Sequence, residues 1–418
     1  MNMTKYKKEG HIMLLQFKFK NFKSFAEEAT IDMMATGIKE HSNSLIDVNG
    51  NLVLPVAAIF GANASGKSNI FKAFKAMCVD ILGVFEKNEK HNNIRSFIFD
   101  DELSKEPTEF QVCVNIDDKE YRYGFTRNQT EVFEEWLFEK KFAKGTRSKE
   151  KCVFYRENMI IETKTTNKKE KDEISFVFSM LSENDLLLTL LGKRGKSKYT
   201  NLYEWFQSVA QFQDFSDDYD ERVSTLMAAE FLYDKEILLN DVVSLLQAFD
   251  KSIVNLEIEI EKDSNLNDSY QVYSYHLNSK NEKIKIPFSS ESSGTQKIFS
   301  LATWLMFSIN AGMVLFVDEL DAKLHPLALR YLIRLFTNKN TNKGKGQLIF
   351  SSHNLVCLDS SDLRRDEIWF VEKNNQQSTI FSLYDFKCDD DTIRSDVNFG
   401  KNYLSGRFGA IPFLDEEE

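Results

Sequence analysis

A run of eight residues has the types and the spacing that wrap a phosphate group: Gly61, Ala62, Asn63, Ala64, Ser65, Gly66, Lys67 and Ser68. Its glycines let the backbone curl tightly, so that consecutive N–H groups and a helix N-terminus face an anion. Lys67 would reach the β- and γ-phosphates, and the Ser68 hydroxyl would bind Mg²⁺. A strand-like stretch at 52–60 precedes the run and a helix-compatible stretch at 69–86 follows it. The sequence therefore predicts a nucleoside triphosphate site, against the alternative of a glycine turn before an ordinary helix.

Two carboxylates follow a second apolar stretch, at 313–317, that is typical of a buried strand. Asp318, at the end of this strand, is placed to hold Mg²⁺ directly or through water. Glu319 is placed to orient and deprotonate an attacking water molecule. A further strand, at 347–351, leads to His353. Together with the glycine-rich run, these residues predict hydrolysis of the bound triphosphate.

Alternating apolar and polar residues predict the β-strands that frame this chemistry. The alternation runs through 13–31 with a turn near Asn21, and later strands are expected at 110–116, 121–125, 131–140 and 153–163. The charged stretch 164–173 is interpreted as a solvated turn.

Helical periodicity begins at about residue 174 and continues to 250. We interpret this stretch as a helical insertion whose leucines and aromatic residues form core rather than a cofactor site. Strands resume at 253–260, 270–277 and 283–288, followed by a helix at 295–309, a helix at 326–336 and a strand at 367–372. The predicted domain boundaries are 13–173, 174–250 and 251–418.

The composition agrees with a mixed α/β protein that has a large core. The chain has 418 residues, 42% of them apolar, and a net charge of −11. The acidic total argues against a grip on nucleic acid by the whole molecule, although a local basic groove stays open. Five scattered cysteines without a C-x-x-C pair indicate reduced thiols and no zinc site. We expect a cytoplasmic protein without a membrane partner, because no apolar run approaches the length that spans a bilayer.

Five stretches in this order resemble the ABC-type ATPases, and within them the branch that includes SMC, RecF and overcoming-lysogenization-defect proteins. The stretches are N-F-K-S-F at 21–25, G-A-N-A-S-G-K-S-N at 61–69, S-S-G-T-Q at 292–296, V-D-E-L-D at 317–321 and S-S-H-N at 351–354. The resemblance implies an α/β fold: an ABC-type P-loop ATPase head with a mixed sheet, an antiparallel β portion and the helical insertion. It also implies Mg²⁺ and an ATP molecule held between two chains placed head to tail.

The resemblance assigns a role to each matching residue. Lys67, Glu319 and His353 are the expected catalytic residues, and Ser68 and Asp318 the expected metal ligands. Ser293 and Gly294 would cap the γ-phosphate of the nucleotide on the opposite chain, and Asp321 would cross the interface. The nucleotide-binding set is completed by Gly61, Ala62, Asn63, Ala64, Ser65, Gly66 and Asn69. Thr295 departs from the family's glycine, the family's glutamine loop is expected at 92–100, and the aromatic residue that stacks on adenine is unassigned.

The stretch 402–412 resembles the closing G-R-[FY]-G-A-x-P of a narrower group, the AbiLi/RloA-like ATP-binding proteins of abortive-infection and phage-defence operons. Glu109, Tyr121–Gly124 and Glu134–Trp136 also resemble that group. Arg407 is a candidate phosphate or interface arginine, with a packed tail as the alternative. The resemblance implies a homodimer or larger oligomer that controls a separately encoded effector, a nuclease or toxin, in response to a phage protein or DNA.

Other functions are weighed against this one. Few residues follow His353, and the acidic run 389–391 does not make a metal-dependent nuclease domain, so no built-in nuclease is expected. Isolated histidines and the basic loops 193–198 and 339–345 are interpreted as surface features. The alternatives are a RecF/SMC-like DNA-repair ATPase, and a scaffold that uses ATP as a clamp with negligible turnover.

Overall fold

The computed structural model describes residues 12–83, 95–143, 148–195, 197–209, 213–214, 221–262, 268–322, 324–359, 361–386 and 398–411. A central sheet has the strand order β11-β15-β16-β5-β17-β18. Its strands are β5 (Val56–Gly61), β11 (Gln213–Asp214), β15 (Val314–Asp318), β16 (Gln347–Ser351), β17 (Ile368–Asn374) and β18 (Gln377–Ser382).

The strands β15, β16, β5 and β17 are parallel, and every residue of β5, β15 and β16 is buried. Strands covered on both faces are apolar throughout, as the sequence indicated. Because the carboxyl ends of parallel strands meet at one edge of a sheet, Gly61, Asp318 and Ser351 arrive at the same edge.

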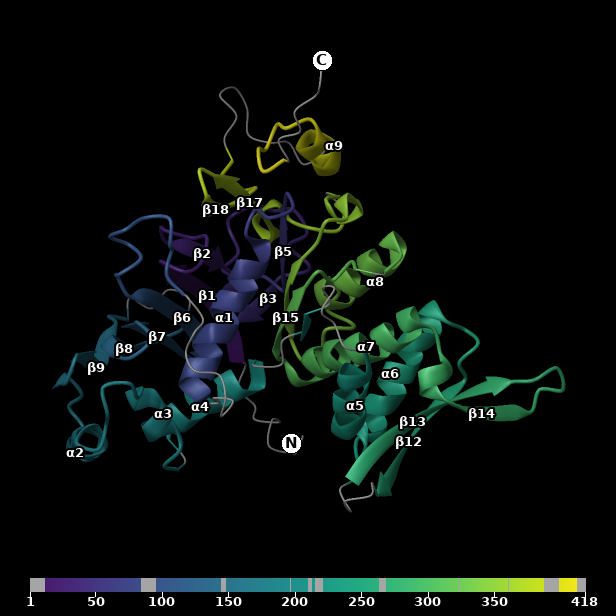
Figure 1. Cartoon of the computed structure of the whole chain (residues 1–418), viewed down its shortest axis with the longest axis horizontal. Helices are drawn as coiled ribbons and strands as arrows, with labels where there is room; N and C mark the ends of the chain where they lie inside the picture. The colour runs from purple at the N-terminus through teal and green to yellow at the C-terminus, as the bar shows by residue number, and fades with distance from the viewer. Residues whose placement is uncertain are drawn as a thin grey trace.

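An antiparallel sheet with the strand order β10-β9-β8-β7-β6-β1-β2 lies beside the central sheet (Figure 1). Its strands are β1 (Ile12–Lys20), β2 (Ala29–Asp32), β6 (Thr108–Ile116), β7 (Lys119–Arg127), β8 (Val132–Lys141), β9 (Lys151–Glu157) and β10 (Ile160–Thr163). A short pair, β3 (Ile46–Val48) and β4 (Asn51–Val53), accompanies it. The predicted α/β class with a separate antiparallel portion is confirmed.

Helices pack around both sheets: α1 (Lys67–Leu82), α2 (Lys168–Phe178), α3 (Leu187–Gly192), α4 (Lys198–Val209), α5 (Glu221–Leu232), α6 (Glu236–Phe249), α7 (Ser293–Ala311), α8 (Pro326–Thr337) and α9 (Phe399–Leu404). The solvated turn predicted at 164–173 is wrong for its second half, because α2 begins at Lys168. The side chain of Asn167 accepts the Lys169 N–H at 3.1 Å, and Ile174 is buried on the inner face. The N-cap hydrogen bond and the buried apolar face therefore stabilise a helix here, although the stretch is rich in charged residues.

The helices between residues 168 and 249 divide between two hydrophobic cores. Buried residues of α2, α3 and α4 belong to the core of the antiparallel sheet and α1. Buried residues of α5 and α6 belong to a second core with α7 and α8, and both helices pack on α7. Figure 1 shows α2, α3 and α4 around the lower end of α1, and α5 and α6 together farther to the right beside α7. The boundaries 13–173, 174–250 and 251–418 remain a prediction.

A third sheet leads into α7. It consists of β12 (Asn255–Lys262), β13 (Asp268–Leu277) and β14 (Lys283–Pro287), all antiparallel. From β13, His276 Nε2 lies 2.7 Å from Glu291 Oε1, immediately before the S-S-G-T-Q stretch. The sheet thereby fixes the loop that carries this stretch.

Buried polar contacts anchor α1 to its surroundings. Asp80 lies 3.2 Å from Arg127 of β7, and neither side chain is more than 2% exposed. The Thr189 hydroxyl of α3 donates to the Ile81 carbonyl at 2.6 Å. Charged groups are buried in proteins mainly when they are paired, so these contacts set the position of α1 and of the loop at its N-terminus.

The residues of β7 and β8 that resemble the abortive-infection group connect neighbouring elements of the fold. The Tyr123 hydroxyl donates to Glu135 at 2.9 Å, and Glu135 accepts the N–H groups of Leu187 and Leu188 at the start of α3. A side chain on Gly124 would meet the Trp136 ring at 2.5 Å. These residues lock β7, β8 and α3 together.

Among the described helices, none is long and apolar enough to cross a lipid bilayer.

Candidate nucleotide site

The glycine-rich run forms a loop between β5 and α1, as the sequence predicts, and we call residues 61–68 the phosphate loop. Gly66 has φ +112° and directly precedes α1. A Cβ on Gly61 would lie 2.3 Å from the Val371 carbonyl oxygen, and one on Gly66 would lie 2.4 Å from Ser378 Oγ. Glycine is required at both positions because the adjacent strands β17 and β18 leave no room for a side chain.

Lys67 points back into the phosphate loop. Its ammonium is buried and donates to the carbonyl oxygens of Gly61 and Ala62, each at 2.9 Å. Burial lowers the pKa of Lys67 to about 8, although the carboxylates of Asp318 and Glu319 oppose this shift. The lysine therefore stands between the loop and the acidic residues, where a bound phosphate needs a cation.

Asp318 and Glu319 are fixed by one serine on the neighbouring strand. Ser351 Oγ, at the end of β16, donates to Asp318 Oδ1 at 2.5 Å and accepts the Glu319 N–H at 2.8 Å. Asp318 is 5% exposed. Glu319 has φ +54°, a left-handed conformation that is uncommon for glutamate. The chain therefore turns at Glu319, directly after β15 ends at Asp318.

His353 and Asp321 lie together beside this turn. The His353 backbone N–H donates to Asp321 Oδ2 at 3.1 Å. Burial, together with the Lys67 charge, lowers the pKa of the His353 imidazole. A lowered pKa favours the neutral ring, in which one nitrogen donates and the other accepts a hydrogen bond.

Ser293 and Gly294 open helix α7. Ser292 is the N-cap, and its Oγ accepts the Thr295 N–H at 3.1 Å. Neither Ser293 nor Gly294 lines the cavity at the phosphate loop described below, and neither do Lys67, Asp318, Glu319 and Asp321. Hydrogen bonds and charge interactions connect Lys67, Asp318, Glu319, Asp321 and His353 with one another, and among the described residues no hydrogen bond joins Ser293 or Gly294 to them.

Helix α7 nevertheless contacts the turn that follows β15 in its own chain and carries Glu319 and Asp321. Lys297 is 1% exposed, and its ammonium donates to the Ala322 carbonyl oxygen. Ala322 directly follows Asp321. A buried lysine thereby joins the S-S-G-T-Q helix to the loop that holds Glu319 and Asp321.

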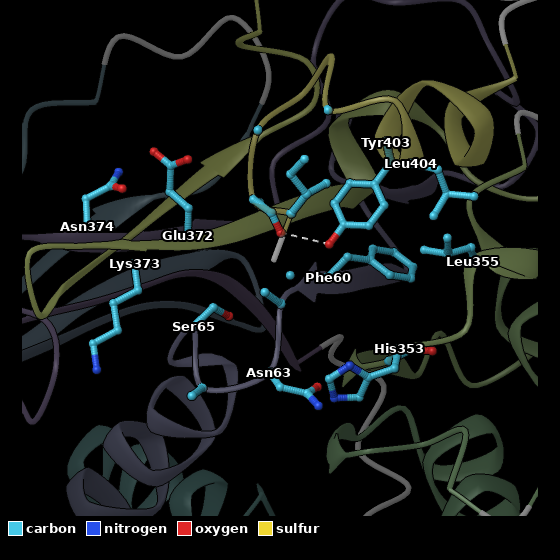
Figure 2. A pocket seen from close by; sticks show the side chains of 18 of the residues that line it. Phe60, Asn63, Ser65, His353, Leu355, Glu372, Lys373, Asn374, Tyr403 and Leu404 are labelled. Carbon is cyan, nitrogen blue, oxygen red and sulfur yellow. Dashed lines mark hydrogen bonds between the residues drawn. The ribbon is translucent and has the colours of Figure 1, made fainter. Parts of the chain in front are cut away.

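A cavity of about 1,110 Å³ lies over the outer side of the phosphate loop. Figure 2 shows Asn63 and His353 on one side of it, the β17–β18 hairpin with Lys373 on another, and Tyr403 and Leu404 of α9 opposite. Ligand cavities commonly measure ~300–1,000 Å³. The volume is large enough for a nucleotide.

Buried polar atoms at the site test whether a triphosphate and Mg²⁺ fit. Ser65 Oγ and Asp321 Oδ1 are buried without a hydrogen-bond partner among the described residues. Such atoms are costly unless a ligand or water satisfies them. Ser65 Oγ, with the loop backbone and Lys67, fits a phosphate-bearing ligand, because its hydroxyl can donate to a phosphate oxygen. Asp321 Oδ1 only accepts, so water or a donor group of another molecule would satisfy it. Ser68 and Asp318 supply the oxygen atoms that Mg²⁺ prefers, and the cation would neutralise charge on the phosphates.

Two serines that the motif analysis left without a role support the phosphate loop from behind. Ser378 Oγ of β18 lies 2.6 Å from the Ser65 carbonyl oxygen and 2.8 Å from Ser24 Oγ. Ser24 Oγ also accepts the Asn69 side-chain N–H at 2.8 Å. The N-F-K-S-F stretch pointed to Ser24, but no local signal distinguishes Ser378, because β18 was not predicted.

Three other expectations have different outcomes. Arg407 is exposed, donates to Asn402 Oδ1 at 3.3 Å and does not line the cavity. The described part of 92–100, residues 95–100, contains no glutamine, so the expected glutamine loop is not found there. The acidic run 389–391 lies outside the described residues.

Comparison with known proteins gives a family and several similar folds. A family model described as "AAA domain, putative AbiEii toxin, Type IV TA system" matches residues 56–359, which include the phosphate loop, Asp318, Glu319 and His353. No curated protein matches the chain. The SMC head bound to the C-terminal winged-helix domain of ScpA has a TM-score of 0.43 and 14% identity, covering 88% of this chain and 97% of that chain. The SMC head domain from Thermotoga maritima has a TM-score of 0.39 and 15% identity, covering 88% and 98%.

Proposed function

Since the chain belongs to the family of AAA domains described as "putative AbiEii toxin, Type IV TA system", and hence to the ATPases, we propose that it is a Mg²⁺-dependent ATPase whose site is completed by a second copy of the chain. The observation that carries the proposal is the meeting of Lys67, Asp318, Glu319 and His353 at one edge of the central sheet, while among the described residues no hydrogen bond joins Ser293 or Gly294 to them. A head-to-tail partner would supply the latter two residues.

Each residue has a distinct task in this mechanism. The loop N–H groups and Lys67 bind the β- and γ-phosphates, and Ser68 and Asp318 hold Mg²⁺. Glu319 orients a water molecule and accepts its proton, while His353 offers a hydrogen bond to the γ-phosphate or to that water. Ser293 and Gly294, at the N-terminus of α7, stabilise the γ-phosphate on the opposite chain. Loss of the γ-phosphate removes that contact, so hydrolysis opens the assembly.

Purified protein tests the chemical part of this proposal. With Mg·ATP, we expect inorganic phosphate to be released and the native mass to rise. Chelation of Mg²⁺ by EDTA should stop release, because the phosphates lose their charge-neutralising cation. A fixed oligomer with unchanged mass and almost no turnover, with and without Mg²⁺, would instead support a scaffold that uses ATP as a structural ligand.

The biological part of the proposal is a sensor subunit of an abortive-infection system that controls a separate effector. The family description supports it, because that description concerns toxin–antitoxin systems. The same description favours a second candidate, in which this chain is itself the toxic component. A RecF/SMC-like role in DNA repair would require a basic surface, which the net charge of −11 does not suggest.

Expression in bacteria separates the first two candidates. A sensor should leave growth unchanged when expressed alone and should arrest growth of infected cells only with its effector. A toxin should arrest growth when expressed alone. In either case the Lys67→Ala variant should be inert, and activity retained by that variant would contradict both.

A further inference from the structure

The last described part of the chain, residues 399–411, packs as an integral part of the fold; we call it the C-terminal segment. Phe399 and Phe408 are buried in the second core. Tyr403 stacks on Phe370 of β17 with ring centroids 5.2 Å apart and planes 8° apart. The Gly400 N–H donates to the Leu358 carbonyl at 3.0 Å. The segment is therefore docked on β17 and on the loop that follows His353.

One carbonyl group of this segment reaches the phosphate loop. The Ala410 oxygen accepts the Ala62 N–H at 3.1 Å and the Tyr403 hydroxyl at 2.8 Å. Figure 2 shows the bond from the Tyr403 hydroxyl as a dashed line. Ala410 has φ +55°, a left-handed conformation that disfavours alanine. The turn at this residue aims its carbonyl at the loop, and Tyr403 holds that carbonyl in place.

The phosphate loop is consequently held at two points on either side of its tip. Ala62 is fixed by the C-terminal segment, and the Ser65 carbonyl is fixed by Ser378 of β18. Between them, Asn63 and Ala64 are exposed and line the cavity. Fixing backbone costs roughly 1–2 kcal/mol per residue. A loop that is already ordered binds its ligand more tightly, because this cost is not incurred on binding.

We propose that the C-terminal segment is a clamp that orders the phosphate loop for a nucleoside triphosphate, with Tyr403 as its positioning residue. The proposal rests on the proposed function, in which that loop binds ATP. It assigns a role to the G-R-F-G-A-I-P stretch, and that role belongs to the Ala410 carbonyl and Tyr403 rather than to Arg407.

Tyr403→Phe is the variant that tests the clamp. It removes the hydroxyl and keeps the ring that stacks on Phe370, so the segment stays docked. Ser405→Ala is the matched control, because Ser405 Oγ donates to the Asn402 carbonyl in the same segment and has no contact with the loop. Residue-resolved hydrogen–deuterium exchange of the nucleotide-free proteins measures the Ala62 amide directly. ATP affinity, kcat and the melting temperature are measured on the same samples.

In Tyr403→Phe we expect the Ala62 amide to exchange about two- to tenfold faster, the range expected for loss of one hydrogen bond. The dissociation constant for Mg·ATP should rise by a similar factor, with kcat within about twofold of wild type, since Glu319 and His353 are untouched. Ser405→Ala should match wild type in both measurements. At saturating ATP, the hydrolysis rate of Tyr403→Phe should return to that of the wild type.

Unchanged Ala62 exchange in Tyr403→Phe would overturn the clamp, whether or not the protein binds ATP. Faster Ala62 exchange in a protein that binds no nucleotide would uphold the clamp and reject the proposed function. Faster exchange with unchanged ATP affinity would show that the contact does not order the loop for binding, which also overturns the proposal.

Discussion

Lys67→Ala should lower the affinity for Mg·ATP by roughly a hundredfold or more. The ammonium of Lys67 is buried inside the phosphate loop, with only the carbonyl oxygens of Gly61 and Ala62 as its recorded hydrogen-bond acceptors among the described residues. A triphosphate would replace these neutral acceptors with charged ones, and hydrogen bonds to charged groups contribute up to about 3 kcal/mol. Isothermal titration calorimetry of wild type and variant measures the loss directly.

The same lysine should make ATP binding depend on pH. Burial lowers the Lys67 pKa to about 8 in the nucleotide-free protein, and phosphates beside it would raise that pKa. Above about pH 8 the free lysine is largely neutral, so binding must take up a proton and the wild-type affinity should fall as pH rises. Lys75→Ala, an exposed position on α1, is the matched control and should bind like wild type. Undiminished affinity in Lys67→Ala would reject the phosphate-loop assignment.

Glu319→Gln should reduce the rate of ATP hydrolysis by about a hundredfold to ten-thousandfold, the range of general-base catalysis, while ATP binding persists. Its backbone is fixed by the hydrogen bond from its N–H to Ser351 Oγ, and the variant keeps that bond. The amide cannot accept the proton of the attacking water. ATP should therefore stay bound, and the assembly should accumulate in its closed form.

Phosphate release and native mass, with and without Mg·ATP, measure both effects. Glu102→Gln changes an exposed carboxylate away from the site and should behave as wild type does. If Glu319→Gln hydrolyses ATP at the wild-type rate and does not change its assembly, another group is the base. If turnover stops but the mass does not rise, the base assignment stands and the head-to-tail assembly is wrong.

The sequence predicted the phosphate loop, the two carboxylates and His353 because each lies in a short contiguous stretch. A phosphate loop needs a strand, two glycines, Lys67 and a helix in direct succession, and the chain folds this stretch as predicted. One apolar strand ends at Asp318, and another ends shortly before His353. Because parallel strands present their carboxyl ends at one edge of a sheet, these strands predicted that the two residues meet there. Alternation likewise indicated the antiparallel sheet.

Contacts between distant segments were decided by the tertiary structure. Ser378 supports Ser65 because β18 pairs with β17, which lies next to β5 in the central sheet, and no local pattern encodes that order. The helical stretch 174–250 shows one periodicity, yet its helices divide between two cores, because periodicity reports an apolar face and not the surface that covers it.

By itself, the sequence indicated the residues that we propose to bind and hydrolyse a triphosphate, because their chemistry depends on neighbours along the chain. The tertiary structure alone decided how the loop is held. The Ala410 carbonyl reaches Ala62 because stacking of Tyr403 on Phe370 brings the C-terminal segment over the start of the phosphate loop. Hydrogen bonds and ring contacts depend on distance in space, and separation along the chain does not reveal them.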